Sequence, residues 1–254
     1  GRWDQLPVVA TRRSANVPGR YGPWPRATRV IAISHAVEEA LRAGGVSADH
    51  ISVIPSTVPV AQLAAEAGAR DSNRAGDGPI VAIGALTSEK GHDILLAALP
   101  IILRGAPSAR LVIAGAGPAR SALVRQAAAL GITDRVEFAG AVDDIPALLR
   151  RAAVLAHPSR REALGTAVLE AMASGVPVVA SCTGGLIELL DGGAGLLVEP
   201  DNPEALAAAL LTVLLDPEPA ALRAATARAR VSAYDGAGMT GRVIQVYRSA
   251  LVAP

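Results

Sequence analysis

The feature that most constrains the fold of this chain is a regular alternation of short apolar runs with helix-length segments between residues 80 and 215. The apolar runs are rich in Val, Ile and Ala, as expected of parallel strands that are buried on both faces. Strands are expected at residues 80–84, 109–115, 135–138, 154–157, 176–181 and 195–198, and helices at residues 92–103, 118–130, 145–151, 186–190 and 203–215. Such alternation predicts an α/β fold with a doubly wound parallel sheet.

A smaller unit of the same kind is expected before this series. It has short β-rich runs at residues 7–11, 29–34 and 51–54, and a helix at residues 35–43 that ends at two glycines. A polar, Gly-rich stretch at residues 71–79 separates the two series. A last helix, residues 239–252, follows a break at Asp235-Gly236 and is expected to leave the second unit.

Composition excludes several classes of protein. A chain of 254 residues is long enough for one large or two small domains. The longest apolar segment, residues 205–215, is too short to span a bilayer, and no signal peptide opens the chain. A net charge of +1 argues against a general nucleic-acid binder. The single cysteine, Cys182, excludes an internal disulfide framework, fits a reducing cytoplasm and is expected to be a buried structural thiol.

The charge is nevertheless uneven along the chain. Residues 1–29 carry six arginines against Asp4 alone, a net +5, and they also hold Trp3, Tyr21 and Trp24. This segment either contacts an anionic acceptor or a membrane surface, or packs against protein that this chain lacks; we favour the second interpretation. Since the chain begins with Gly1 close to an expected strand, we also expect it to be truncated at its N-terminus.

The residues best suited to chemistry lie at residues 157–180, in a strand–turn–helix–strand sequence. Glu162 precedes the helix, Glu170 lies two turns inside it, and Gly165 and Thr166 begin it with free backbone N–H groups. A helix N-terminus attracts phosphate, and each carboxylate can accept hydrogen bonds from a pair of sugar hydroxyls. The arrangement suits a sugar–diphosphate–ribose–base molecule, although an ordinary βαβ unit remains an alternative.

Other candidates follow neighbouring strands, at the carboxyl edge where doubly wound sheets bind ligands. Lys90 lies in a loop that begins at Gly84 and can act as a point charge on a diphosphate, although a solvated loop lysine remains an alternative. Gly115 and Gly117 form a G-x-G turn, which is a weak signal because Arg120 replaces the third glycine of a dinucleotide fingerprint. The four histidines show no metal-ligand spacing, so no metal site is expected. His92 lies either near the diphosphate or simply at the helix start.

The string P-S-x-x-E, then L-G, then E-A-M-A-x-G-x-P-V-V-A in residues 158–180 resembles the signature of the retaining family-4 glycosyltransferases. The resemblance extends over nearly the whole chain and implies the two-domain GT-B fold. It implies the remnant of an acceptor-binding N-terminal domain at residues 1–57 and a nucleotide-sugar-binding domain at residues 58–235. Residues 236–254 would then form a helix that returns to the N-terminal domain.

The same resemblance assigns roles to individual residues. It places Lys90 on the diphosphate, Glu162 on the donor sugar and Glu170 on the ribose diol. It implies that backbone donors of Leu164, Gly165 and Thr166 bind sugar and phosphate, and that Val142 contacts the base. The small residues of the turn at Gly115 and Gly117 would let the nucleotide approach the backbone. Many relatives carry Arg where this chain has Ala85, so a second positive group is not identified.

These roles imply a retaining sugar transfer from a nucleoside-diphosphate sugar, with UDP-sugar the default donor and no cofactor or metal. The acceptor would be a lipid or a glycan, and the protein would be cytoplasmic, with peripheral membrane contact an option. Because most of the acceptor domain is missing, we expect weak donor binding and no turnover by this chain alone. Three alternatives remain: a nucleotide-sugar epimerase, a glycoside hydrolase with paired carboxylates, and a non-catalytic nucleotide-binding module.

Overall fold

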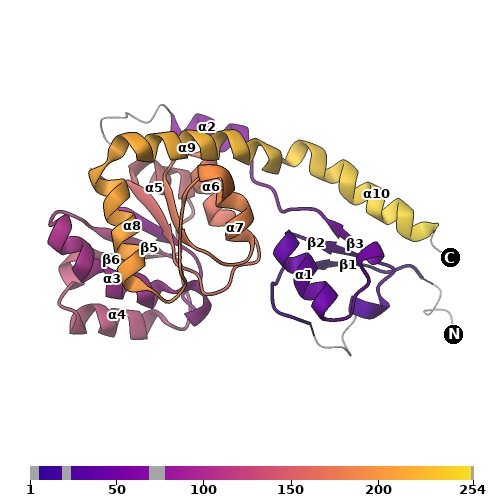
Figure 1. Ribbon diagram of the computed structural model, residues 1–254, viewed down its shortest axis with the longest axis horizontal. Coiled ribbons are helices and arrows are strands. Elements are labelled where there is room, and N and C mark those ends of the chain that lie inside the picture. Colours follow the sequence, from indigo (N-terminus) through magenta and orange to yellow (C-terminus); the bar gives the residue numbers. More distant parts are fainter. Residues whose placement is uncertain (1–5, 19–23, 69–77, 253–254) are drawn as a thin grey trace.

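A computed structural model describes residues 6–18, 24–68 and 78–252, and it contains two parallel sheets (Figure 1). The first sheet has the order β1-β2-β3. Its strands and the helix between the last two are β1 (Val9–Arg12), β2 (Arg29–Ala32), α1 (His35–Ala43) and β3 (Ile51–Val53). All of its strand pairs are parallel, as the alternating pattern predicts.

The second sheet has six parallel strands in the order β6-β5-β4-β7-β8-β9. Its strands are β4 (Ile80–Ile83), β5 (Leu111–Ala114), β6 (Val136–Gly140), β7 (Val154–His157), β8 (Val178–Ser181) and β9 (Leu196–Val198). The chain moves outward from β4 to β6, then returns to place β7 on the other side of β4. The predicted doubly wound fold is therefore confirmed, and its topological switch point lies between β4 and β7, where such sheets bind ligands.

Helices cover both faces of the second sheet. They are α3 (His92–Gly105), α4 (Arg120–Ala129), α5 (Ile145–Arg151), α6 (Thr166–Ala173), α7 (Gly185–Leu190), α8 (Pro203–Leu215) and α9 (Pro217–Val231). Strand residues alternate between the faces: Ile80 and Val154 pack with Leu99 and Leu210 of α3 and α8, whereas Leu155 packs with α6 and α9. Apolar side chains on both sides of each central strand explain its unbroken burial.

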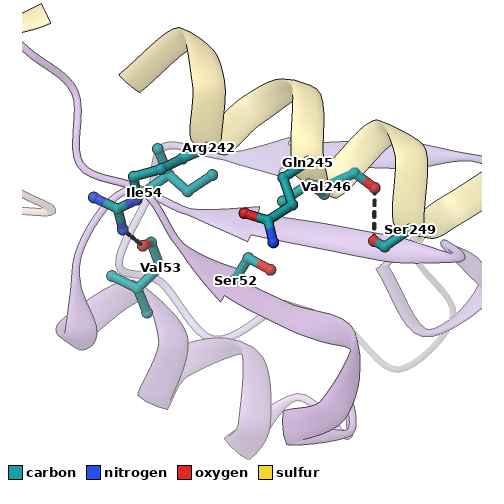
Figure 2. Close-up of a pocket in the computed structure, with 7 residues that line it drawn as sticks. All are labelled: Ser52, Val53, Ile54, Arg242, Gln245, Val246 and Ser249. Carbon is teal, nitrogen blue, oxygen red and sulfur yellow. Dashed lines mark hydrogen bonds between the residues drawn. The ribbon is translucent and has the colours of Figure 1, made fainter. Parts of the chain in front are cut away.

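The last helix, α10 (Met239–Leu251), returns to the first sheet, where Val246 packs with Ile31 and Ile54 (Figure 1). A cavity of about 320 Å³ lies between α10 and the edge strand β3. There Arg242 Nη2 donates a hydrogen bond to the Val53 carbonyl at 2.5 Å, which caps the open edge (Figure 2). The domain limits at residues 57/58 and 235/236 stay predictions.

The two units are joined at several points. Val58 N–H bonds the Tyr234 carbonyl at 3.2 Å, so the two chain crossings between the units run side by side. One buried apolar cluster also extends from Val37 of α1 to Leu164 and Leu186 of the second unit. The hydroxyl of Ser34 caps α1, accepting from Val37 N–H at 3.2 Å, and donates to the Ala163 carbonyl. The first sheet is thereby held beside the loop that carries Glu162.

Two helices were not expected from the sequence. The helix α2 (Val60–Ala67) buries Leu63 and Ala67, one turn apart. The helix α9 buries Ala220, Ala224 and Ala227 at helical spacing. Alanine is apolar and small, and in an Ala-rich segment that stripe does not stand out as a period.

The structure corrects one expectation and leaves others outside its limits. Cys182 is exposed, so the prediction of a buried thiol is wrong: it follows the last residue of β8, where the chain has left the core. Of the basic segment, Arg12 is used internally, because its guanidinium lies 4.8 Å from the ring centroid of Trp24. Arg2, Trp3, Arg20 and Tyr21 lie outside the described residues.

None of the helices within the described ranges is by itself both long and apolar enough to span a membrane. One bent pair, Pro203–Leu215 with Pro217–Tyr234 at 100°, meets that criterion by length and composition only.

Candidate functional site

The loops after β4 and β7 meet at the switch point and bring Lys90 to Glu162. Lys90 Nζ lies 2.6 Å from Glu162 Oε2. The turn that presents Lys90 ends at Gly91, whose φ of +64° is left-handed. A Cβ at this position would lie 2.0 Å from the Pro158 carbonyl oxygen. Only glycine lets the start of α3 pass this close to the β7 loop.

Glu162 accepts two further hydrogen bonds. His157 Nε2 lies 2.7 Å and Ser159 Oγ 3.4 Å from the same oxygen, Oε2. Burial disfavours the charged carboxylate, but the hydrogen bond and charge of His157, followed by those of Lys90, outweigh it and lower the pKa of Glu162 to about 2. Glu162 is therefore a fixed anion. Its lone pairs can accept sugar hydroxyls, but it is poorly suited to act as an acid.

No role was predicted for His157 from the sequence, in which the four histidines show no metal-ligand spacing. It is buried at the last position of β7, immediately before the P-S-x-x-E string. The available signal was its place at a strand end, five residues before Glu162. Because its ring reaches Glu162, His157 orients that carboxylate.

The two carboxylates singled out from the sequence have different environments. Glu170 lies on α6, half-buried, and burial raises its pKa. Its carboxylate has no hydrogen bond or ion pair to any residue within the described ranges. Glu162 is already engaged, whereas Glu170 is available to a ligand.

The N-terminus of α6 lies between these carboxylates. Gly165 has a φ of +103° and precedes Thr166, the exposed first residue of the helix, and no side chain caps this end. Within the described residues the N–H groups of Thr166 and Ala167 have no partner and are open to an anion, whereas Val168 N–H bonds the Gly165 carbonyl at 3.0 Å. Leu164 is buried, and the predicted contact of its backbone with a ligand stays a prediction.

The glycine turn after β5 has a packing role. A Cβ on Gly115 would lie 1.9 Å from the Gly84 carbonyl oxygen, and one on Gly117 would lie 2.5 Å from the Leu86 carbonyl oxygen. Leu86 N–H also bonds the Ala116 carbonyl at 2.9 Å. The glycines thus let the β4 and β5 loops lie together, and approach of a nucleotide at this turn stays a prediction. Val142, which follows β6, is half-buried, and its contact with a base also stays a prediction.

Arg160 joins the loops and was missed in the sequence. Its guanidinium bonds Asp93 twice, at 2.9 and 2.7 Å, and reaches Asp201 Oδ1 and the Ser88 carbonyl at 2.6 Å each. Asp201 is the one non-glycine residue with positive φ, at 56°, in the part of the chain that the structure describes. The hydrogen bond from Arg160 is the largest factor that lowers the pKa of Asp93. Arg160 therefore fixes the loop of Glu162 against the turn of Lys90.

His92, expected near the diphosphate or at the helix start, begins α3 and is only 2% exposed. The backbone of Gly84 and Ala85 lies near its ring, but neither ring nitrogen makes a well-formed hydrogen bond to a described residue. Burial, aided by the nearby His157, lowers its pKa to about 4. His92 is thus a buried neutral residue behind the site. Across the described ranges no three His, Cys, Asp or Glu side chains form a cluster that could hold a metal, and the expectation of no metal stays a prediction.

A cavity of about 210 Å³ opens in front of the Lys90–Glu162 pair, and we call it the cleft cavity. One wall is the loop after β1, and the other comes from the second unit. Its lining residues are Arg13, Ser14, Ala15, Asn16, Glu89, Lys90, Arg161, Glu162 and Ala163. The cleft cavity therefore lies between the two units, against the candidate residues.

Two facing Rossmann-like units with a site between them define the GT-B class. Solved structures share this fold. A crystal structure of Anabaena Alr3699/HepE in complex with UDP and glucose matches with a TM-score of 0.84 at 26% identity, over 96% of this chain and 72% of that chain. Sucrose-phosphate synthase from Thermosynechococcus elongatus matches with a TM-score of 0.77 at 31% identity, over 91% of this chain and 60% of that chain.

Residues 69–230, more than half of the chain, match the family model described as glycosyl transferases group 1, and the chain belongs to this family. It is 34% identical over 235 residues to the GDP-mannose-dependent alpha-(1-6)-phosphatidylinositol monomannoside mannosyltransferase of Mycolicibacterium smegmatis, covering 86% of this chain and 59% of that protein. It is 37% identical over 181 residues to the glycogen synthase of Mycobacterium tuberculosis, covering 70% and 44%. The chain spans about half the length of the curated relatives it matches. The epimerase alternative is not favoured.

Proposed function

We propose that this chain is the donor-binding part of a retaining glycosyltransferase, which moves a sugar from a nucleoside-diphosphate sugar to a lipid or glycan acceptor. The observation that carries the proposal is the contrast at the switch point. Glu162 is held by Lys90 and His157, while the Glu170 carboxylate and the first two N–H groups of α6 have no partner among the described residues. An anion-binding helix end between two carboxylates fits a diphosphate between sugar and ribose.

In the proposed complex, Glu170 accepts the ribose hydroxyls and Glu162 accepts those of the donor sugar. Lys90 and the first N–H groups of α6 bind the diphosphate. Since Lys90 contacts Glu162 when no ligand is bound, donor binding must redirect its ammonium group toward phosphate. After this movement the charge of Lys90 is balanced by phosphate, and Glu162 still accepts a hydrogen bond from His157.

The proposed transfer proceeds by departure of the nucleoside diphosphate from the face that the acceptor attacks, which retains configuration. As the bond to the leaving oxygen breaks, Lys90 and the α6 N–H groups stabilise the charge that develops on the diphosphate. This transfer does not require a covalent intermediate on Glu162 or on Glu170. No metal is required by these steps.

Donor and acceptor are narrower proposals. UDP is the proposed nucleotide, supported by the UDP in the HepE structures, whereas the mannosyltransferase relative is named for GDP-mannose. A lipid acceptor at the inner face of a membrane, for an otherwise cytoplasmic protein, is supported by the phosphatidylinositol acceptor in that relative's name. A glycan acceptor is supported by the glycogen synthase relative. We propose that this chain alone binds donor weakly and does not turn over.

The deciding experiment is calorimetric titration of the chain with UDP, GDP and ADP, without added metal, on the wild type and on Glu170→Gln. The matched control is Glu137→Gln, which replaces an exposed carboxylate in the outer strand β6. We expect one nucleotide to be preferred, and its binding to be lost in Glu170→Gln alone. Equal binding of all three, unchanged by Glu170→Gln, contradicts the proposed donor site.

A further inference from the structure

The cleft cavity holds five charged side chains, three of them cationic. Arg161 Nη2 lies 2.5 Å from Glu89 Oε1, and Lys90 lies 2.6 Å from Glu162. These two pairs compensate four of the charges within the cavity itself. The fifth, Arg13, is exposed to the cavity and has no hydrogen bond or ion pair to any residue in the described ranges. Counted over the described residues, the cleft cavity therefore carries one positive charge without an anionic partner.

The position of Arg13 is set by its neighbours. The preceding residue, Arg12, stacks on Trp24 and donates to the Asn16 carbonyl at 2.5 Å, and Asn16 N–H bonds Ser14 Oγ at 3.3 Å. These contacts fold residues 12–16 into a closed turn at the end of β1. The hydrogen bond from Ser34 to Ala163 holds the opposite wall beside it. Arg13 thus lines the same cavity as the Lys90–Glu162 pair, on a constrained turn of the other unit.

We propose that Arg13 binds a phosphate group in the cleft cavity. A guanidinium group presents a planar fork of N–H donors that matches phosphate in geometry and charge. A cleft between low-dielectric walls strengthens that attraction. Ser14 and Asn16 line the same cavity, and their side chains carry neutral donor groups. A neutral glycan would leave the Arg13 charge uncompensated.

The phosphate has two chemical sources at this place. One is the donor diphosphate, which Arg13 would reach from the side opposite Lys90. The other is a phosphate group on the acceptor, such as a lipid headgroup or a phosphorylated glycan. The proposal rests on the proposed function only for the identity of these two substrates, because Arg13 lacks an anionic partner among the described residues whatever the reaction.

The test uses Arg13→Ala and Arg13→Lys, with Arg26→Ala as the matched control. Arg26 is exposed in the same unit and does not line the cleft cavity. One arm titrates each protein with UDP, and with uridine to remove the phosphate contribution. The other arm saturates each protein with UDP and titrates inorganic phosphate at constant ionic strength; uptake is followed by calorimetry. We expect Arg13→Ala to weaken one arm about tenfold, Arg13→Lys to weaken it less, and Arg26→Ala to change neither.

Each outcome decides the proposal. If Arg13→Ala binds UDP more weakly, Arg13 binds the donor diphosphate. If it binds inorganic phosphate more weakly, Arg13 binds a phosphate group of the acceptor. If Arg13→Ala changes neither UDP binding nor phosphate binding, the proposal is wrong. If the wild type binds none of UDP, GDP and ADP, the proposed function fails instead. Phosphate uptake by the free wild type and Arg13→Ala proteins then still decides the role of Arg13.

Discussion

Arg160 and Asp93 are joined by two parallel hydrogen bonds, Nη1 to Oδ1 at 2.9 Å and Nη2 to Oδ2 at 2.7 Å. Asp93 lies in the first turn of α3, three residues after Lys90, and Arg160 lies two residues before Glu162. A paired Arg–carboxylate contact fixes orientation as well as distance. This contact therefore sets how the Lys90 turn faces the Glu162 loop.

Breaking this contact is expected to impair donor binding more than stability. Asp93 is 43% exposed, so screening limits the loss of unfolding free energy in Asp93→Asn to about 1 kcal/mol. The affinity for a nucleotide sugar should fall about tenfold, because Lys90 and Glu162 lose their alignment. Urea unfolding and calorimetric titration measure the two effects. A double-mutant cycle with Arg160→Lys should be non-additive in affinity, and full additivity would contradict the alignment role.

The two carboxylates should separate nucleotide recognition from sugar recognition. Glu162→Gln should leave binding of the bare nucleoside diphosphate largely intact and weaken binding of the nucleotide sugar, since Glu162 contacts only the sugar in the proposed complex. Glu170→Gln should weaken both ligands, because it removes the ribose acceptor. Titration of each variant with UDP and a UDP-sugar distinguishes them. Similar losses for UDP in both variants would exclude this division of roles.

Replacement of Lys90 by Ala should weaken diphosphate binding by about 1.5–3 kcal/mol, the range for hydrogen bonds to charged groups. The reason is that Lys90, the only lysine of the chain, supplies the one side-chain ammonium group that can bind the diphosphate. Titration with UDP and with uridine tests the prediction, because uridine affinity should not change. A negligible effect on UDP would mean that Lys90 serves only to hold Glu162.

The second sheet and two of its site residues were predictable from the sequence, whereas the contacts between loops were not. Strand alternation predicts the second sheet because buried parallel strands must be apolar on both faces, and Lys90 and Glu162 were identified from their places at strand ends. Their direct contact was not predicted, because it joins residues 72 positions apart. The roles of His157 and Arg160 likewise exist only through the contacts of folded loops. Cys182 was misjudged because a strand end sits at the surface as readily as in the core.

Folding stability should fall as the pH drops from about 6.5 to about 4 because of His92. Its pKa in the folded state is lowered to about 4 by burial, so the unfolded chain binds a proton in this window and the folded chain does not. The stabilisation is present above pH 6.5 and is lost as the pH falls, by up to about 3 kcal/mol. Urea unfolding at pH 7 and pH 5 measures it. His92→Gln should flatten the dependence, and His50→Gln, at an exposed histidine, should not; equal curves for His92→Gln and wild type would contradict the prediction.

Gly91→Ala should destabilise the protein far more than Gly131→Ala, although the two glycines share nearly the same left-handed φ, +64° and +67°. At Gly131 no atom lies within 4 Å of an added Cβ, so only the backbone penalty of about 1 kcal/mol applies. At Gly91 the added Cβ meets the Pro158 carbonyl oxygen at 2.0 Å, and either α3 or the β7 loop must move. That movement separates Lys90 from Glu162, so UDP-sugar affinity should fall in Gly91→Ala and stay unchanged in Gly131→Ala. Urea unfolding and titration of both variants measure these differences, and equal destabilisation would show that the β7 loop yields without cost.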